Sequence, residues 1–334
     1  MSDPTLTIIW AGIISFAIGA YVVMDGFDLG IGILFPRFTV GQERDMAMNT
    51  IAPVWDGNET WLVLGGGGLM AAFPLAYAVI LPALYAPLIA MLLALVFRGV
   101  AFEFRWRDPE HRRFWDASFF TGSLVATFAQ GITLGALLQG IEVQDRAYAG
   151  GWWDWLTPFS LLCGAALVVG YAMLGACWLV MKGTGTLHNK ARRIAILLTP
   201  VLLGAIGTVS LATPFVDPQY YDRWLDSPGL FVTIPMPLLV IFCAFMLWRS
   251  LESNYEARPF SWALALFVLS MIGLAVSIWP YVVPGSVTIF DAAAPRDSQI
   301  FMLIGASVMV PVILAYTAWA YWVFRGKVDE AGYH

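Results

Sequence analysis

The sequence predicts an all-α integral membrane protein with nine transmembrane helices, and three observations predict this fold class. Of the 334 residues, 59% are hydrophobic and only 12% are charged, whereas soluble chains carry about 25% charged residues. Apolar runs recur along the whole chain at roughly 20 residues each, the length that a helix needs to cross a bilayer. These runs lack the alternation of apolar and polar residues that marks the strands of a β-barrel.

The nine spans follow one another with short polar connections. The first and third are long enough to tilt or to project from the membrane. The second is the least apolar, because Asp56 and Glu59 lie at its start. Prolines are expected to bend or end the second and third spans, namely Pro53, Pro74, Pro82 and Pro87. We expect the spans near residues 6–35, 50–73, 77–104, 116–141, 158–182, 191–215, 230–252, 260–282 and 300–325.

The loop charges predict the orientation. With nine spans, all but three of the 18 Lys and Arg residues fall on one side of the membrane; the exceptions are Arg146, Arg223 and Arg296. Basic loops stay in the cytoplasm, so the N-terminus is expected outside and the C-terminus in the cytoplasm. The first residues lack the basic and small-residue pattern of a signal peptide, so the first helix is expected to be retained.

We expect residues 1–334 to form one polytopic membrane domain, with two four-helix bundles and one peripheral helix. A weak parallel repeat relates residues 1–150 to residues 151–285 and leaves the helix at 300–325 extra. The alternative is that the two halves look alike only because all inner loops are basic.

Charged residues within the spans are the most informative feature for function. Asp25 and Asp28 lie on the first span, Asp56 and Glu59 on the second, and Arg98 on the third. Charges are costly in hydrocarbon and usually persist there to handle protons, ions or substrates. A spacing of three residues places each acidic pair on one helix face. All five lie toward the cytoplasmic end, which predicts a hydrated charged pocket there with Arg98 as the counter-ion.

The functional interpretation of this pocket is proton uptake from the cytoplasm, with Asp25 and Asp56 as the leading candidates. Asp28, Glu59 and Glu103 are weaker candidates, because they lie closer to the membrane surface. Glu103 could simply pair with Arg107 at helical spacing. The structural alternative is a salt-bridged clamp in which Arg98 holds one acid and no proton moves.

Glycines and polar residues predict close helix contacts. Gly26 with Gly30, and Gly131 with Gly135, form small-residue faces that let helices approach closely. The run from Gly65 to Gly68 could admit another backbone or a flat ligand, although ordinary helix packing is the simpler account. Polar side chains of the fourth span, among them Ser123, Thr127 and Gln130, are explained by interhelical hydrogen bonds or by a polar path.

Several cofactor and enzyme classes are excluded by what the chain lacks. The histidines, which are His111, His188 and His334, all lie outside the spans. A membrane haem usually needs an axial His, although Met and Cys can also serve. No haem-attachment motif is present, and the cysteines lack the close spacing of a metal site. A phosphate-binding loop is also absent. We therefore expect this chain to ligate no haem and no metal, and to bind no nucleic acid.

Three motifs in the first 110 residues carry a family resemblance. They are Met24-Asp25-Gly26-Phe27-Asp28-Leu29-Gly30, then Trp55-Asp56-Gly57-Asn58-Glu59 followed by the glycine run and Ala72-Phe73-Pro74, and Arg98-Gly99-Val100-Ala101-Phe102-Glu103-Phe104-Arg105. Their order and spacing resemble subunit II of cytochrome bd-type quinol oxidases. The sequence around Trp55 and Gly65 is similar to that of the cyanide-insensitive branch of that family.

The resemblance implies a heterodimer in the bacterial cytoplasmic (inner) membrane. Subunit I would carry two b-type haems, one d-type or third b-type haem, and the quinol site. The complex would oxidise quinol, reduce oxygen to water and build a membrane potential without pumping, while this chain would not be catalytic alone. Membrane lipids and small single-span accessory subunits are further expected partners. Part of the proton path would lie in subunit II, with candidates Asp25, Asp56 and Arg98, followed by Asp28, Glu59 and Glu103.

Two other functions remain open from the residues. A proton-coupled secondary transporter would also use membrane acids, although typically at the midplane and without a partner. A purely structural scaffold for subunit I would need no proton path.

Overall fold

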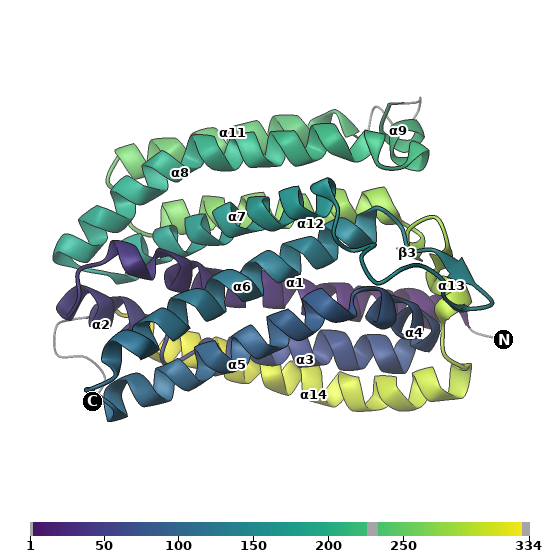
Figure 1. The fold of residues 1–334 in the computed structure, drawn as a ribbon, viewed down its shortest axis with the longest axis horizontal. Coiled ribbons are helices and arrows are strands. Elements are labelled where there is room, and N and C mark those ends of the chain that lie inside the picture. Colours follow the sequence, from purple (N-terminus) through teal and green to yellow (C-terminus); the bar gives the residue numbers. More distant parts are fainter. Residues whose placement is uncertain (1–2, 226–232, 329–334) are drawn as a thin grey trace.

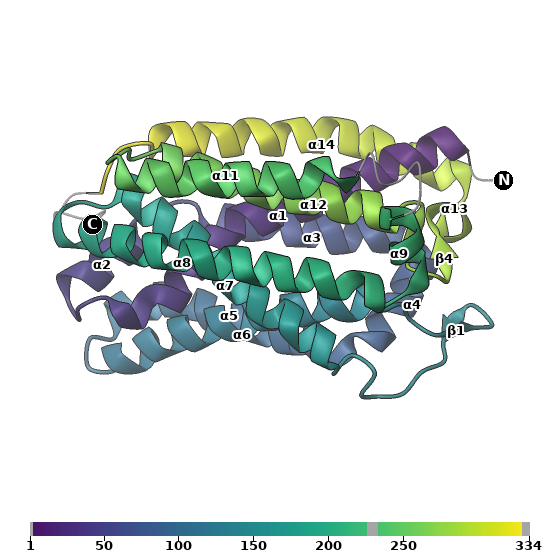
Figure 2. The same ribbon diagram turned by 90° about the horizontal axis from the view of Figure 1, so that it is seen from above.

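The computed structural model describes residues 3–225 and 233–328, which form one bundle of long helices (Figures 1 and 2). The long helices run side by side along the longest axis. They are α1 (Pro4–Leu34), α3 (Trp55–Ala72), α5 (Tyr85–Arg107), α6 (Arg112–Leu138), α7 (Pro158–Lys182), α8 (Gly185–Ala212), α11 (Pro235–Glu252), α12 (Arg258–Ile278) and α14 (Arg296–Val323).

Short elements cap the two ends of the bundle. Near the end of α1 lie the 3-10 turn η1 (Phe35–Arg37) and helix α2 (Gln42–Asn49). The other end carries two antiparallel two-stranded hairpins, β1 (Val143–Gln144) with β2 (Ala147–Tyr148) and β3 (Tyr281–Val283) with β4 (Val287–Thr288). It also carries the 3-10 turn η2 (Thr213–Phe215) and the short helices α9 (Pro218–Leu225) and α13 (Ile289–Ala292).

Among the described residues, eight helices are long and apolar enough to cross a membrane, and they correspond to eight of the nine predicted spans. Helix α3 falls short of that standard, because its polar first turn and its four glycines lower its mean hydropathy. It nevertheless packs along α1 within the bundle. The all-helical membrane fold is therefore confirmed, and the count of nine stays a prediction.

The predicted boundaries were wrong in two places. The span expected at 77–104 is two helices, α4 (Pro74–Ala83) and α5. The break expected from Pro82 and Pro87 is confirmed, because these residues lack the amide hydrogens that a continuous helix needs. The span expected from residue 50 begins only at Trp55, and α2 before it was not predicted. Residues 230–232 of the span expected at 230–252 lie outside the described residues, and α11 begins at Pro235.

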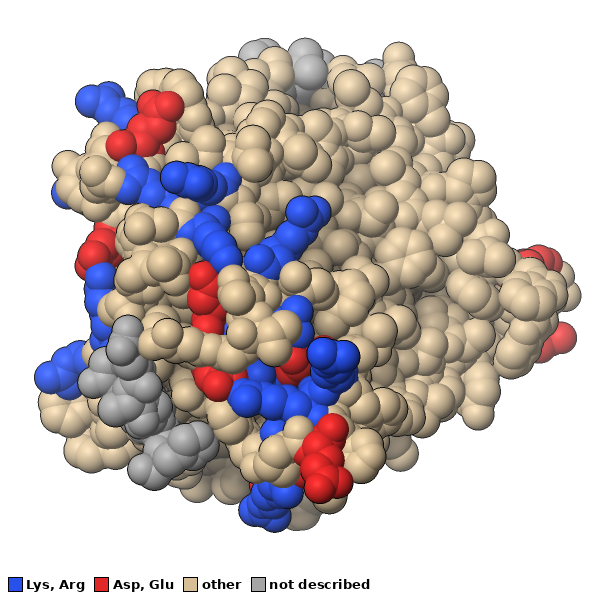
Figure 3. Space-filling model, turned by 60° about the vertical axis from the view of Figure 1, so that its left-hand side comes forward, with Lys and Arg blue, Asp and Glu red and all other residues tan. Residues whose placement is uncertain are grey.

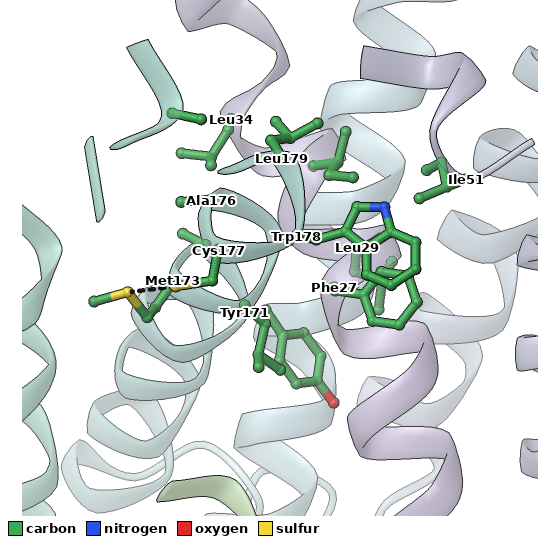
Figure 4. Packing of buried hydrophobic residues seen from close by; sticks show 14 of the residues in the cluster. Phe27, Leu29, Leu34, Ile51, Tyr171, Met173, Ala176, Cys177, Trp178 and Leu179 are labelled. Atoms are coloured by element: carbon green, nitrogen blue, oxygen red, sulfur yellow. Dashed lines mark hydrogen bonds between the residues drawn. The ribbon is translucent and has the colours of Figure 1, made fainter. Parts of the chain in front are cut away.

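Helices α1 and α7 make the closest crossing in the core. A Cβ atom added to Gly30 would lie 1.8 Å from the carbonyl oxygen of Tyr171, so only glycine fits there. Phe27 of α1 stacks on Trp178 of α7 with ring centroids 4.1 Å apart. Figure 4 shows side chains of both helices meeting at this crossing. The small-residue face predicted on the first span is thereby confirmed.

Basic residues gather at one end of the bundle, which we call the basic end. It is formed by α2, the last turns of α1, α5, α7 and α11, and the first turns of α6, α8 and α12. Figure 3 shows Lys and Arg side chains concentrated there. Asp3 caps the first turn of α1, and Val328 donates to the Lys182 carbonyl at the end of α7, so these two residues lie at opposite ends of the bundle. Which end faces the cytoplasm stays a prediction.

Candidate functional site

Four charged side chains from three helices meet inside the bundle, and we call them the charge cluster. Arg98 of α5 lies at its centre, with Nη2 3.0 Å from Oδ1 of Asp25 and 3.8 Å from Oδ2 of Asp28, both on α1. Its Nη1 lies 3.6 Å from Oε2 of Glu59 on α3. The side chains of Arg98, Asp25 and Asp28 are wholly buried, and that of Glu59 is 24% exposed. Three acids thus share one guanidinium, and Glu59 is the member that reaches the surface.

Local sequence explains why the cluster forms. Asp25 and Asp28 are one turn apart on α1 and therefore face the same neighbours. Gly122 lets α6 approach α5 closely, since a Cβ there would lie 3.0 Å from the amide nitrogen of Arg98. This close approach encloses the Arg98 side chain in protein.

An aromatic pair covers Arg98 on the side of the basic end. The rings of Trp55 and Phe102 stack with centroids 4.7 Å apart. Arg98 Cζ lies 5.9 Å and 5.7 Å from their respective ring centroids, within reach of a cation–π interaction. Phe102 is one turn nearer the basic end than Arg98, so the pair separates Arg98 from that surface.

Asn58 links the cluster to the last helix. Its Nδ2 donates to Oδ2 of Asp28 at 2.8 Å, and its Oδ1 accepts from Tyr321 Oη of α14 at 2.9 Å. Neither Asn58 nor Tyr321 was expected in the cluster from the sequence. The position of Asn58 between Asp56 and Glu59 could have indicated its role. No feature of the sequence connects Tyr321 with this region.

A row of polar side chains extends from the cluster away from the basic end. Tyr21 lies one turn before Asp25 on α1, and its Oη accepts from Gln130 Nε2 at 2.6 Å. Tyr171 Oη then donates to Gln130 Oε1 at 3.0 Å. Ser123 Oγ and Thr127 Oγ1 on α6 are buried without a hydrogen-bond partner among the described residues. The interhelical hydrogen bonding expected of Gln130 is confirmed.

The structure does not bring Asp56 and Glu103 into the cluster. Asp56 is exposed in the first turn of α3 and forms no ion pair with Arg98. Glu103 is 60% exposed and pairs with Arg107, with Oε2 3.3 Å from Nη2. The simple ion pair considered for Glu103 is therefore confirmed.

A second ionic network, which the sequence did not reveal, joins α2 to the turn between α5 and α6. Arg105 is buried, with Nε 2.5 Å from Asp116 Oδ1 and Nη2 2.8 Å from Asp45 Oδ1. Arg44 Nη1 binds Asp116 Oδ2 at 2.7 Å, and Arg112 also pairs with Asp45. Acids and bases balance more closely here than in the charge cluster, and the network holds α2 at the basic end.

The histidines are poorly placed for haem. His111 lies just before α6 beside Asp108, and Nδ1 of His188, in the first turn of α8, is hydrogen-bonded to the Val180 carbonyl at 2.8 Å. His334 lies outside the described residues. No group of three or more His, Cys, Asp or Glu suited to a metal ion occurs among the described residues.

Comparisons with known proteins agree on one family. The model of the family "Cytochrome bd terminal oxidase subunit II" matches residues 6–324. The chain is 33% identical to the "Probable cytochrome oxidase subunit 2" of Haemophilus influenzae, covering 96% of this chain and 94% of that protein. It is 32% identical to subunit 2 of the cytochrome bd-I ubiquinol oxidase of Escherichia coli K12, covering 97% and 96%.

The fold also matches a solved structure. A chain of the bd oxidase from Geobacillus thermodenitrificans superposes with a TM-score of 0.78 over 96% of this chain and 98% of that chain. The two sequences are 15% identical, so this likeness concerns the fold.

Proposed function

The chain belongs to the family of subunit II of cytochrome bd terminal oxidases, and on that premise we propose that its charge cluster delivers protons from the cytoplasm for the reduction of oxygen to water. The observation that carries this proposal is the burial of Asp25, Asp28 and Arg98 with Glu59 at the surface. A buried carboxylate beside a partly exposed one can receive protons from outside and pass them inward.

The proposed assembly is a heterodimer with a haem-bearing subunit I in the bacterial inner membrane. Subunit I would hold the two b-type haems, the third haem and the quinol site, which fits the unsuitable histidines of this chain. The distribution of basic residues supports a cytoplasmic basic end and an outer N-terminus. The same proposal includes nine spans, with α3 as the ninth. They would be arranged as two parallel four-helix halves and one extra helix.

Asp56 extends the proposed path toward the partner. It lies on an exposed stripe of α3 that continues through Val63 and Met70 at helical spacing. No ion pair joins its carboxylate to a described residue. A carboxylate on a membrane helix is costly unless a neighbouring chain supplies a polar or charged partner for it. We therefore place the contact with subunit I on this stripe, where Asp56 would pass protons across.

A structural clamp is the main alternative, and the number of acids argues against it. One guanidinium is enough to neutralise one buried carboxylate, yet three carboxylates surround Arg98. Burying an excess of like charge is costly unless one acid binds a proton. A cluster that must hold a proton is suited to exchanging it, whereas a clamp gains nothing from the second and third acids.

The test replaces Asp25 with Asn in the purified complex and measures oxygen consumption with excess quinol, the membrane potential in proteoliposomes, and the haem absorbance spectrum. Glu103→Gln is the matched control, since Glu103 is an exposed acid outside the cluster. We expect Asp25→Asn to slow oxygen reduction by at least about tenfold, because positioned proton-transfer groups contribute about 100-fold or more, and to leave the haem spectrum intact.

Glu103→Gln is expected to behave as wild type. The proposal fails if Asp25→Asn reduces oxygen and builds potential at the wild-type rate per haem. Loss of assembled complex, with unchanged turnover of what remains, would favour the scaffold function instead.

A further inference from the structure

A hollow of about 570 Å³ lies at the basic end, where α8 and α11 meet. It is lined by Asn189, Arg192, Arg193 and Ile196 of α8 and by Glu252 of α11. Figure 1 shows α8 and α11 together along one edge of the bundle, with α14 along the other. The hollow therefore lies on the outer surface of the bundle, away from the α3 stripe that we propose contacts subunit I.

The charged side chains that line this hollow have no ion-pair partner among the described residues. Arg192, Arg193 and Glu252 form no ion pair or side-chain hydrogen bond with any described residue, whereas Lys190 one turn earlier binds Glu43 at 2.7 Å. Two guanidinium groups and an amide can together bind the oxygens of a phosphate. The carboxylate of Glu252 on the facing helix can bind a cation.

Apolar stripes continue from the hollow along both helices. On α8, the exposed residues Leu197 and Val201 follow Arg193 at intervals of one turn. On α11, Trp248, Phe245 and Ile241 precede Glu252 in the same way and are also exposed. Both stripes run away from the basic end, along the membrane-spanning parts of the helices. A ligand for this site therefore has a charged head and long apolar tails.

We propose that the hollow binds one phospholipid whose headgroup carries both a phosphate and a primary ammonium group, as in phosphatidylethanolamine. The phosphate would contact Arg192, Arg193 and Asn189, the ammonium would contact Glu252, and the acyl chains would lie along the two stripes. Basic pockets between membrane helices on the cytoplasmic side bind the phosphates of lipid headgroups. Glu252 disfavours a headgroup with only negative charge, because its carboxylate would face that charge without a cation.

The test is native mass spectrometry of the complex, purified from the membrane and exposed to equal amounts of phosphatidylethanolamine and phosphatidylglycerol. The double variant Arg192→Gln, Arg193→Gln removes the phosphate contacts. Arg113→Gln is the matched control, because Arg113 is an exposed arginine of the basic end that does not line the hollow. We expect the double variant to lose one tightly bound phosphatidylethanolamine, with affinity reduced about ten- to thirtyfold, while Arg113→Gln retains it.

Glu252→Gln tests the ammonium contact, and we expect it to abolish the preference for phosphatidylethanolamine over phosphatidylglycerol. Equal lipid retention by wild type and the double variant would overturn the proposal. So would displacement of the lipid by inorganic phosphate, which would identify a small-anion site. A preference for phosphatidylglycerol in wild type would contradict the role given to Glu252.

Discussion

Replacing Arg98 with Gln tests how the charge cluster is held together. The change leaves Asp25 and Asp28 wholly buried and only one turn apart, without their counter-ion. Removing one partner of a buried ion pair costs about 3–5 kcal/mol, because an uncompensated charge remains inside. For a helical bundle of this size we expect the unfolding temperature of the purified complex to fall by about 10 °C.

The distances predict how this effect divides between the acids. Arg98 lies 3.0 Å from Asp25 and 3.8 Å from Asp28, and at an effective dielectric constant of about 20 this difference in distance corresponds to about 1 kcal/mol of attraction between ionised groups. Double-mutant cycles of Arg98→Gln with Asp25→Asn and with Asp28→Asn should therefore show stronger coupling to Asp25, by about 1 kcal/mol.

The assay is differential scanning calorimetry of the complex at neutral pH, with Arg107→Gln as the control on the same helix. Arg107 pairs with Glu103 at the surface, and exposed pairs contribute about 0–1 kcal/mol. If Arg98→Gln were no less stable than Arg107→Gln, or if coupling to Asp28 exceeded coupling to Asp25, the structural account of the cluster would be refuted.

Three further predictions concern other parts of the chain. Burial alone would raise the pKa of Glu43, but hydrogen bonds from Lys190 and Thr39 lower it from 4.5 to about 2. Its stabilising effect is therefore present above pH 4.5 and lost as the pH falls toward 2, so calorimetry across this range should show a weaker pH dependence for Glu43→Gln than for wild type. Gly30→Ala should prevent accumulation of folded chain in membranes, because its Cβ would meet the backbone of α7. Gly12→Ala, on the same helix, has open space around its Cβ and should accumulate normally. Equal amounts of both variants on immunoblots would contradict the packing. Tyr321→Phe removes the hydrogen bond to Asn58 and should cost about 1 kcal/mol in calorimetry, while Tyr316→Phe, an exposed tyrosine of the same helix, should cost nothing; equal effects would argue against this contact.

Hydropathy and spacing predicted the helices well, because burial in lipid leaves a pattern that needs no knowledge of neighbours. Helix α7 begins at Pro158 and ends at Lys182, as expected. The pattern failed at α4 and α5, where apolar residues continue across the break and only Pro82 and Pro87 indicate it. It also missed α2, whose stability depends on ion pairs to distant residues such as Arg105.

The site was predicted in part, for a comparable reason. The three-residue spacing correctly predicted that Asp25 and Asp28 share a helix face. Arg98 was correctly expected beside them, because all three residues lie toward the same end of their spans. The rotation of α3 about its own axis could not be read from the sequence, because its glycines leave no clear apolar face. In the structure, Glu59 lies beside Arg98, whereas Asp56 is exposed. The contact of Tyr321 with Asn58 joins residues 263 positions apart, which no local pattern reveals.

We propose that protons for oxygen reduction pass through the charge cluster from the side of the basic end. The most direct measurement follows proton uptake with a pH-sensitive dye, confined to one side of proteoliposomes of known orientation, during a single turnover with oxygen. We expect uptake from the compartment that faces the basic end, slowed at least about tenfold in Asp25→Asn. Uptake from the opposite compartment, or uptake at the wild-type rate in Asp25→Asn, would contradict the account.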